Sequence, residues 1–261
     1  MIFKLRDLNI ELWRRLVQLY KGDPLNHVYI FYDIIYEPDI TEVYIDYEDG
    51  EIKGYILIYY GFKIPAAHAY GRITGLLNEI PLKTLRFHVR EGHLKTVISF
   101  LKNRGEIEEA GHFLDMAVNK EDFKPYFSEK AVPLTKKNLR DYYEIKRQRS
   151  SELTLESAKH LLSKRLYYGL YHNKKLVSIA CAYLRLPEVW VIGDVYTDPA
   201  YRGRGYAKTV TSAITERALK CGARALLHVK EENTPAVRVY KRLGYKTIGI
   251  KYWFRFTPKE A

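Results

Sequence analysis

The most informative part of this sequence reads Val195-Tyr196-Thr197-Asp198-Pro199-Ala200-Tyr201-Arg202-Gly203-Arg204-Gly205-Tyr206-Ala207-Lys208. The pattern of apolar residues predicts a strand over 189–197 before the loop, and a helix over 206–221 after it. Gly203 and Gly205 let the backbone of the loop approach a ligand closely. Unpaired N–H groups and the positive end of the helix dipole lie at the same place. The loop is therefore predicted to bind a pyrophosphate.

The same residues exclude two common phosphate-binding loops. The run from Gly203 to Lys208 lacks the third glycine of the G-x-G-x-x-G turn that binds dinucleotides. It also lacks the Gly-Lys-Ser/Thr ending of the nucleoside-triphosphate loop. The predicted site therefore belongs to another class of phosphate-binding loop.

A second motif follows the next predicted strand, which covers 225–229. It reads Asn233-Thr234-Pro235-Ala236-Val237-Arg238-Val239-Tyr240-Lys241-Arg242-Leu243-Gly244-Tyr245, and predicts a helix with proline in its first turn and glycine at its end. Together with Arg202-x-x-Gly205-x-Ala207, this motif resembles the signature of the GNAT superfamily of acyl-CoA-dependent N-acetyltransferases. The resemblance covers about residues 131–256. It implies a mixed α/β sheet flanked by helices and splayed where the cofactor enters.

The resemblance also implies a reaction and a set of site residues. Acetyl-CoA would be the co-substrate, without a metal, and a primary amine would attack it directly in a ternary complex. Tyr240 would be the general acid beside the thioester sulfur, and Asn233 would bond the pantetheine arm. Backbone N–H groups at the strand end would hold the acyl carbonyl. The residues expected to contact the cofactor are Val195, Tyr196, Thr197, Arg202, Gly203, Arg204, Gly205, Tyr206, Ala207, Lys208, Asn233 and Tyr240.

The reaction also needs a group that takes the proton of the attacking amine, because a primary amine has a pKa near 10.4. The catalytic candidates for this base are Asp194, His228 and Glu188, in that order. A histidine with a pKa near 6.5 could relay a proton at pH 7. A chain of waters to bulk solvent is the alternative, and in that case no side chain is essential.

The chain is predicted to contain two domains, an N-terminal α/β domain over 1–125 and an acetyltransferase domain over 126–261. The polar stretch 118–125, which contains a proline, reads as the linker. Some glycine N-acyltransferase-like members of the superfamily carry an extra N-terminal region of this kind.

The first half shows a weak similarity in layout to the second. Leu5, Leu8, Leu12, Leu16 and Leu19 predict a helix. A tyrosine-rich hairpin over 42–59 follows that helix, and the second half has the same order of helix and hairpin. We therefore predict that the first half is a degenerate acyltransferase-like or related α/β domain, with chance similarity of two hairpins as the alternative.

The charge of the chain bears on its partners. The 261 residues carry a formal net charge of +12, which fits either an anionic partner or a lysine-rich solvated surface. The phosphates of CoA would meet Arg202, Arg204 and Lys208. The resemblance places the run 147–149, which reads Arg-Gln-Arg, beside the acceptor site, where it could attract an acidic acceptor.

These observations lead to expectations about the partners. We expect a small-molecule or protein amine as acceptor, no membrane partner, no nucleic acid, and a homodimer as an option. The alternative function is a catalytically silent acyl-CoA-binding regulatory module.

Composition completes the sequence-based expectations. No run of apolar residues approaches the roughly 18 that suggest a membrane span, and the charged N-terminus does not resemble a signal peptide, so we expect a cytoplasmic protein. Scarce Gln, Cys and Met among many charges suggest a thermophile. Cys181 and Cys221 are predicted to be packed rather than reactive. His88 and His93 lack the neighbours of a metal site.

Overall fold

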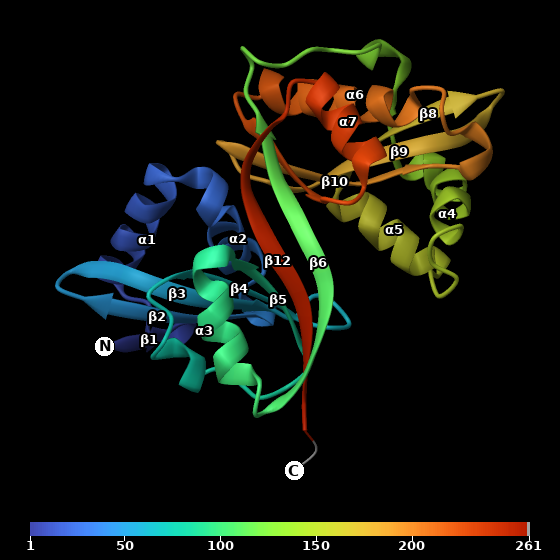
Figure 1. Ribbon diagram of the computed structural model, residues 1–261. Coiled ribbons are helices and arrows are strands. Elements are labelled where there is room, and N and C mark those ends of the chain that lie inside the picture. Colours follow the sequence, from blue (N-terminus) through green and yellow to red (C-terminus); the bar gives the residue numbers. More distant parts are fainter. Residues whose placement is uncertain (260–261) are drawn as a thin grey trace. The chain divides into compact units, whose positions relative to one another are not determined.

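The computed structural model describes residues 1–259, which form two compact units (Figure 1). The first unit contains Met1–Leu114, Lys230–Glu232 and the described residues from Gly249 onward. The second unit contains Asp115–Val229 and Asn233–Ile248. Both units are mixed α/β structures, as the sequence predicts. The domain division at residue 125 stays a prediction.

The first unit is a sheet with three helices, and its strands follow the order β1-β2-β3-β4-β5-β12-β6. The strands β6 and β12 also contribute residues to the second unit. The elements are β1 (Ile2–Lys4), α1 (Ile10–Gly22), α2 (Pro24–Tyr36), β2 (Thr41–Glu48), β3 (Glu51–Tyr59), β4 (Ala66–Gly71), β5 (Leu85–Arg90), α3 (Glu91–Leu101), β6 (Gly105–Val118) and β12 (Lys246–Pro258).

The helix predicted near the N-terminus begins later than its leucine pattern indicates. The side chain of Asn9 accepts hydrogen bonds from the N–H groups of Glu11 and Leu12 and so starts α1 at Ile10. Leu5 lies before this cap in a short 3-10 turn. The prediction was therefore wrong for Leu5 and Leu8, because their spacing carried no information about the cap. The predicted hairpin is confirmed by β2 and β3.

The second unit is the part of the chain that contains both motifs. Its strands follow the order β6-β11-β10-β9-β8-β7, and Figure 1 shows α6 and α7 over one face of this sheet and α4 and α5 over the other. The elements are β7 (Val132–Pro133), α4 (Leu139–Arg147), α5 (Leu155–Lys164), β8 (Leu166–His172), β9 (Lys175–Arg185), β10 (Val189–Thr197), α6 (Tyr206–Lys220), β11 (Arg224–Lys230) and α7 (Thr234–Arg242).

The two parallel strands of the second unit separate along their length. Strand β10 pairs with β11 from Val189 only as far as Ile192, which lies opposite Leu227. Both strands continue beyond this point, so the remaining residues of β10 have no partner on the β11 side. The register between β10 and β9 is also irregular in the region where the pairing with β11 ends. This separation is the splay that the sequence resemblance predicts.

The first unit repeats part of this arrangement. Strand β4 is antiparallel to β3 and parallel to β5, just as β10 is antiparallel to β9 and parallel to β11. The parallel pairing of β4 with β5 likewise stops early, at His68 opposite His88. The loop after β4 leads only to a 3-10 turn, Leu76–Asn78, and not to an α-helix.

The segment predicted as a linker is fastened to the second unit. The N–H of Lys124 donates to the carbonyl of Leu243 at 3.0 Å, and Lys246 Nζ lies 2.6 Å from Asp122 Oδ1. Gly244, at φ +95°, packs so closely on this segment that a Cβ would lie 2.0 Å from the Asp122 carbonyl oxygen. The segment therefore has a fixed course over the end of α7.

The two cysteines have different environments. Cys181 is fully buried in the core between the sheet and the helices α4 and α5, and burial raises the pKa of its thiol to about 12. This core position agrees with the prediction. Cys221 is exposed, so its predicted packing was wrong. It follows the last residue of α6 and so lies off the buried face of the helix.

Helices long and apolar enough to span a bilayer do not occur in the described part, residues 1–259. The predicted cytoplasmic location stays a prediction.

Candidate active site

A cavity of about 860 Å³ in the second unit contains every residue predicted to contact the cofactor. Its size lies within the range of about 300–1,000 Å³ that is usual for small-molecule sites. Every charged residue among the described residues that line it is basic. The lining residues are Tyr126, Val195, Tyr196, Thr197, Tyr201, Arg202, Gly203, Arg204, Gly205, Tyr206, Ala207, Lys208, Asn233, Pro235, Ala236, Val239, Tyr240 and Arg242.

The glycine loop forms a backbone cradle at one end of this cavity. Gly203 and Gly205 have φ values of +78° and +80°, a conformation that suits glycine and exposes successive N–H groups. Gly205 is the N-cap of α6 and offers no side chain to the first N–H groups of the helix. Those N–H groups and the helix dipole are therefore available to an anion.

Basic side chains surround the cradle. Arg202 Nε donates to the carbonyl of Thr197 at 3.2 Å, which fixes this side chain across the loop. Burial lowers the pKa of Lys208, and the positive charge of Arg242 lowers it further. Lys208 and Arg242 are therefore close enough to repel each other, and a bound anion would relieve the repulsion.

Asp198 shapes the loop rather than the cavity surface. Its carboxylate accepts hydrogen bonds from Lys175 Nζ at 2.8 Å and from the N–H of Ala200 at 3.0 Å. The bond from Lys175 holds the pKa of this carboxyl below its ordinary value. Asp198 therefore stays ionised and caps the 3-10 turn Pro199–Tyr201 that leads into the glycines.

The second motif forms the opposite wall. Asn233 Oδ1 accepts from the N–H of Ala236 and so caps α7, which leaves its Nδ2 as the group able to donate to a ligand. Tyr240, also on α7, is only 7% exposed, and burial raises its pKa to about 12. The Tyr240 hydroxyl therefore keeps its proton at neutral pH.

Asp194, the first candidate for the base, does not line the cavity. It has φ +52° and lies in the irregular part of β10. Its carboxylate receives Lys146 Nζ at 2.6 Å, Arg149 at 3.0 Å and the hydroxyl of Tyr167 at 2.7 Å. These contacts occupy the carboxylate and connect the end of α4 to the strand.

The other two candidates also lie away from the cavity lining. His228 Nδ1 is 2.6 Å from Asp115 Oδ1, and both side chains are buried. Glu188 precedes β10, and its carbonyl accepts from the N–H of Arg224 at 2.9 Å. The structure thus brings the cofactor candidates together with Tyr240, but it does not bring Asp194, His228 or Glu188 to the same surface.

Six lining residues were missed in the sequence. Ala236, Val239 and Arg242 lie on the face of α7 that carries Tyr240, so helical spacing could have found them. Pro235 and Tyr201 are parts of the motifs themselves. No sequence pattern predicts Tyr126 as a lining residue, because it lies far from both motifs in the sequence.

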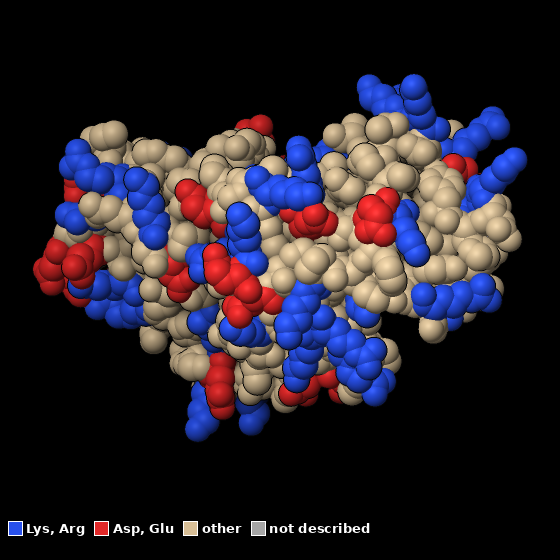
Figure 2. All heavy atoms as spheres, turned by 90° about the horizontal axis from the view of Figure 1, so that it is seen from above, with Lys and Arg blue, Asp and Glu red and all other residues tan. Residues whose placement is uncertain are grey.

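The charge of the molecule is not confined to this site. Figure 2 shows Lys and Arg side chains spread over the face in view, with Asp and Glu side chains among them. This distribution agrees with the reading of a lysine-rich surface. Clusters of three or more His, Cys, Asp or Glu side chains that could hold a metal ion do not occur within residues 1–259.

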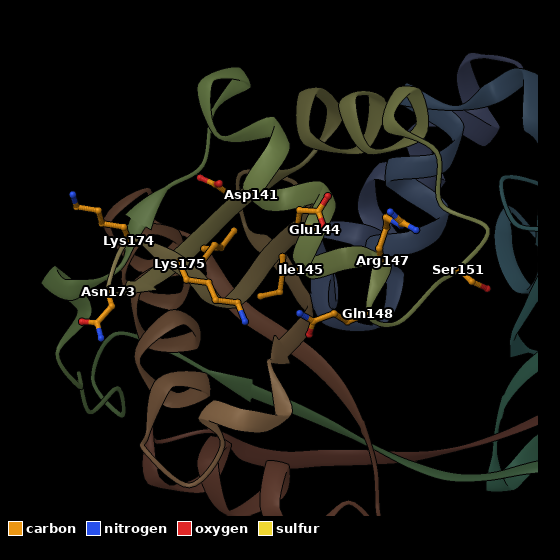
Figure 3. A pocket seen from close by; sticks show the side chains of 10 residues that line it. Asp141, Glu144, Ile145, Arg147, Gln148, Ser151, Asn173, Lys174 and Lys175 are labelled. Atoms are coloured by element: carbon orange, nitrogen blue, oxygen red, sulfur yellow. The ribbon is translucent and has the colours of Figure 1, made fainter.

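A second cavity, of about 800 Å³, lies beside α4 and the turn between β8 and β9. Figure 3 shows Lys175 and Gln148 extending toward one another in it, and both donate to Asp198 Oδ2. Gln148 also accepts from the hydroxyl of Tyr196, at 3.0 Å. The run 147–149 therefore supports the wall of the first cavity.

Comparison with known proteins agrees with this geometry. Residues 131–245 match the Acetyltransferase (GNAT) family, so this part of the chain is similar to that family. An uncharacterized N-acetyltransferase of Methanocaldococcus jannaschii is 36% identical over 74 residues, which cover 28% of this chain. The match spans only 33% of the length of that protein.

Two solved structures extend the likeness in fold to the whole chain. A Drosophila protein has a TM-score of 0.75 at 12% identity, with 97% of this chain and 98% of that chain covered. A tandem GNAT protein from the clavulanic acid biosynthesis pathway has a TM-score of 0.61 at 11% identity, with 100% and 99% covered. The likeness in fold therefore includes the first half, although the first half carries neither motif. The predicted likeness to the N-terminal region of glycine N-acyltransferase-like proteins stays a prediction.

Proposed function

We propose that this protein transfers an acetyl group from acetyl-CoA to a primary amine by direct attack. The observation that carries the proposal is the single cavity that joins the splayed strand, the glycine cradle and Tyr240. The match of residues 131–245 to the GNAT family supports acyl transfer from acetyl-CoA. The proposed acceptor is a primary amine of a small molecule or a protein, in particular of a molecule that also carries acidic groups.

The cavity suits the proposed co-substrate in shape and charge. The cradle at Gly203 and Gly205, with Arg202, Arg204 and Lys208 around it, would hold the pyrophosphate. Asn233 would donate to the pantetheine arm through Nδ2. The N–H groups at the end of β10 that face away from β9 would hold the acyl carbonyl.

The chain's own groups would then act on a thioester carbonyl, which is the activated acyl group that acetyl-CoA supplies. N–H groups of β10 would stabilise negative charge on the carbonyl oxygen. The Tyr240 hydroxyl, protonated at neutral pH because its pKa is about 12, would donate to the sulfur as the carbon–sulfur bond breaks. A protonated amine loses two protons in all: the thiol gains one through Tyr240, which recovers its proton from water, and the other leaves to bulk solvent.

The proposal assigns the proton of the amine to water. Neither Asp194 nor His228 lines the cavity, and the carboxylate of Asp194 is already bound by two cations. A water chain to bulk solvent therefore replaces a side-chain base in this mechanism.

The test is release of CoA thiol from acetyl-CoA in the presence of a panel of primary amines. We expect turnover by the wild type and a loss of at least about tenfold in kcat for Tyr240→Phe, because the Phe side chain cannot donate to the sulfur. Tyr36→Phe, an exposed tyrosine of α2, is the matched control and should leave kcat unchanged. Binding of CoA without release for any amine would instead identify the silent binding module, which the comparisons do not favour.

A further inference from the structure

Tyr126 lies against the phosphate cradle although it is distant from both motifs in the sequence. Its N–H donates to Ser212 Oγ at 2.8 Å. Ser212 lies on the buried face of α6, and its hydroxyl is also 2.7 Å from Ser128 Oγ. The backbone at Tyr126 is therefore attached to the helix whose N-terminus forms the cradle.

The side chain of Tyr126 reaches two members of the cradle. Lys208 Nζ lies 3.2 Å from the centre of the Tyr126 ring, which is a close cation–π contact. A Cβ added to Gly205 would lie 3.0 Å from the Tyr126 hydroxyl oxygen. The hydroxyl is therefore next to the N-cap of α6, and the ring lines the same cavity.

These contacts give Tyr126 two means of acting on an anion. A phenol O–H beside the first N–H groups of α6 can donate to an oxygen bound there. The ring also holds the ammonium of Lys208 at the cradle. Because the ammonium is already in position, binding of the ligand does not carry the entropic cost of fixing this side chain.

We propose that Tyr126 belongs to the phosphate site, where its hydroxyl donates to a phosphate oxygen of the cofactor and its ring positions Lys208. This inference rests on the proposed function, since it assumes that the cavity binds the pyrophosphate of CoA. It adds a binding residue from the segment between β6 and β7, a part of the chain that neither motif includes.

The experiment compares Tyr126→Phe and Tyr126→Ala with wild type and with the control Tyr36→Phe. Affinity is measured calorimetrically for CoA and for dephospho-CoA, which retains the pyrophosphate. Turnover is measured with acetyl-pantetheine, which has no phosphate. We expect Tyr126→Phe to weaken both nucleotides by about tenfold, the usual effect of losing one hydrogen bond to a charged group. Its turnover of acetyl-pantetheine should match wild type.

The variant Tyr126→Ala distinguishes two roles of the Tyr126 side chain, binding of phosphate and obstruction of the cavity. It should weaken CoA further than Tyr126→Phe does, because Lys208 also loses its platform. Tighter binding of CoA by Tyr126→Ala would overturn the proposal and identify the ring as a plug. Unchanged affinity in Tyr126→Phe would overturn it as well, with the proposed function intact. If wild type binds no CoA, the proposed function fails and this inference fails with it.

Discussion

Substitution of Gly205 by alanine tests the cradle at the place where backbone and ligand requirements coincide. Gly205 has φ +80°, and an L-residue in this conformation costs roughly 1–2 kcal/mol. The new Cβ would also lie 3.0 Å from the Tyr126 hydroxyl oxygen, so the ring must shift. Moving a side chain from its rotamer costs about 0.5–1.5 kcal/mol. The expected loss of stability is the sum, about 1.5–3.5 kcal/mol.

Gly222 is a matched control at the other end of the same helix. It has φ +85°, and a Cβ there would meet nothing within 4 Å. Gly222→Ala should therefore lose only the backbone contribution, about 1–2 kcal/mol. Both variants would be measured by urea unfolding, with CoA affinity as a second readout. We expect Gly205→Ala, and not Gly222→Ala, to bind CoA more weakly, because Gly205 lines the cavity and Gly222 does not.

A double-mutant cycle isolates the contact with Tyr126. In a Tyr126→Ala background, the difference in stability between Gly205→Ala and Gly222→Ala should disappear, because the obstructing hydroxyl is gone. If Gly205→Ala is no less stable than Gly222→Ala, or if the difference persists without Tyr126, the structural explanation is wrong.

The remaining predictions concern the acid, the carboxylate of β10 and the first unit. Burial raises the pKa of Tyr240 from 10.0 to about 12. The contribution of Tyr240 to the free energy of unfolding should therefore be constant below pH 10 and fall between pH 10 and 12, where the unfolded state releases this proton and the folded state keeps it. An alkaline fall in kcat/KM near pH 8 that Tyr240→Phe abolishes would contradict this. Asp194→Asn should lose about 3–5 kcal/mol of stability, because Lys146 stays largely buried without its charged partner, and should retain kcat within about tenfold. A larger loss of kcat at normal stability would restore Asp194 as the base. Calorimetry should find one CoA per chain, and a second site of similar affinity would refute that.

The second unit could be predicted well because its signals are local. Apolar spacing predicts the strand 189–197 and the helix that follows it, and proline and glycine at the helix ends predict the helix of the second motif. Both motifs place their own residues on the cavity, since each sits at the join of a strand and a helix. Local physics and function coincide there.

The missed features depend on contacts between distant parts of the chain. Tyr126 reaches the cradle through Ser212, which is 86 residues away, and no spacing rule connects two such positions. The pairing of Asp194 with Lys146 and Arg149 likewise needs the packing of α4 on the sheet. A carboxylate next to the expected site was therefore ranked as a base, although its partners give it a structural environment.

The first unit shows why a shared fold does not imply a shared site. Its parallel strands β4 and β5 separate beyond His68 and His88, but the cavity at that opening has only about 20 Å³. Tyr29 stacks on His68 with ring centroids 4.7 Å apart, and Tyr55 stacks on Tyr70 at 5.3 Å, so aromatic rings occupy the opening. The described connection between β4 and β5 contains a 3-10 turn and no α-helix, which leaves no aligned N–H groups for a pyrophosphate there. The same strand arrangement therefore forms an aromatic core in one unit and a cavity lined by basic side chains in the other, and this difference is the physical basis for the prediction of one CoA per chain.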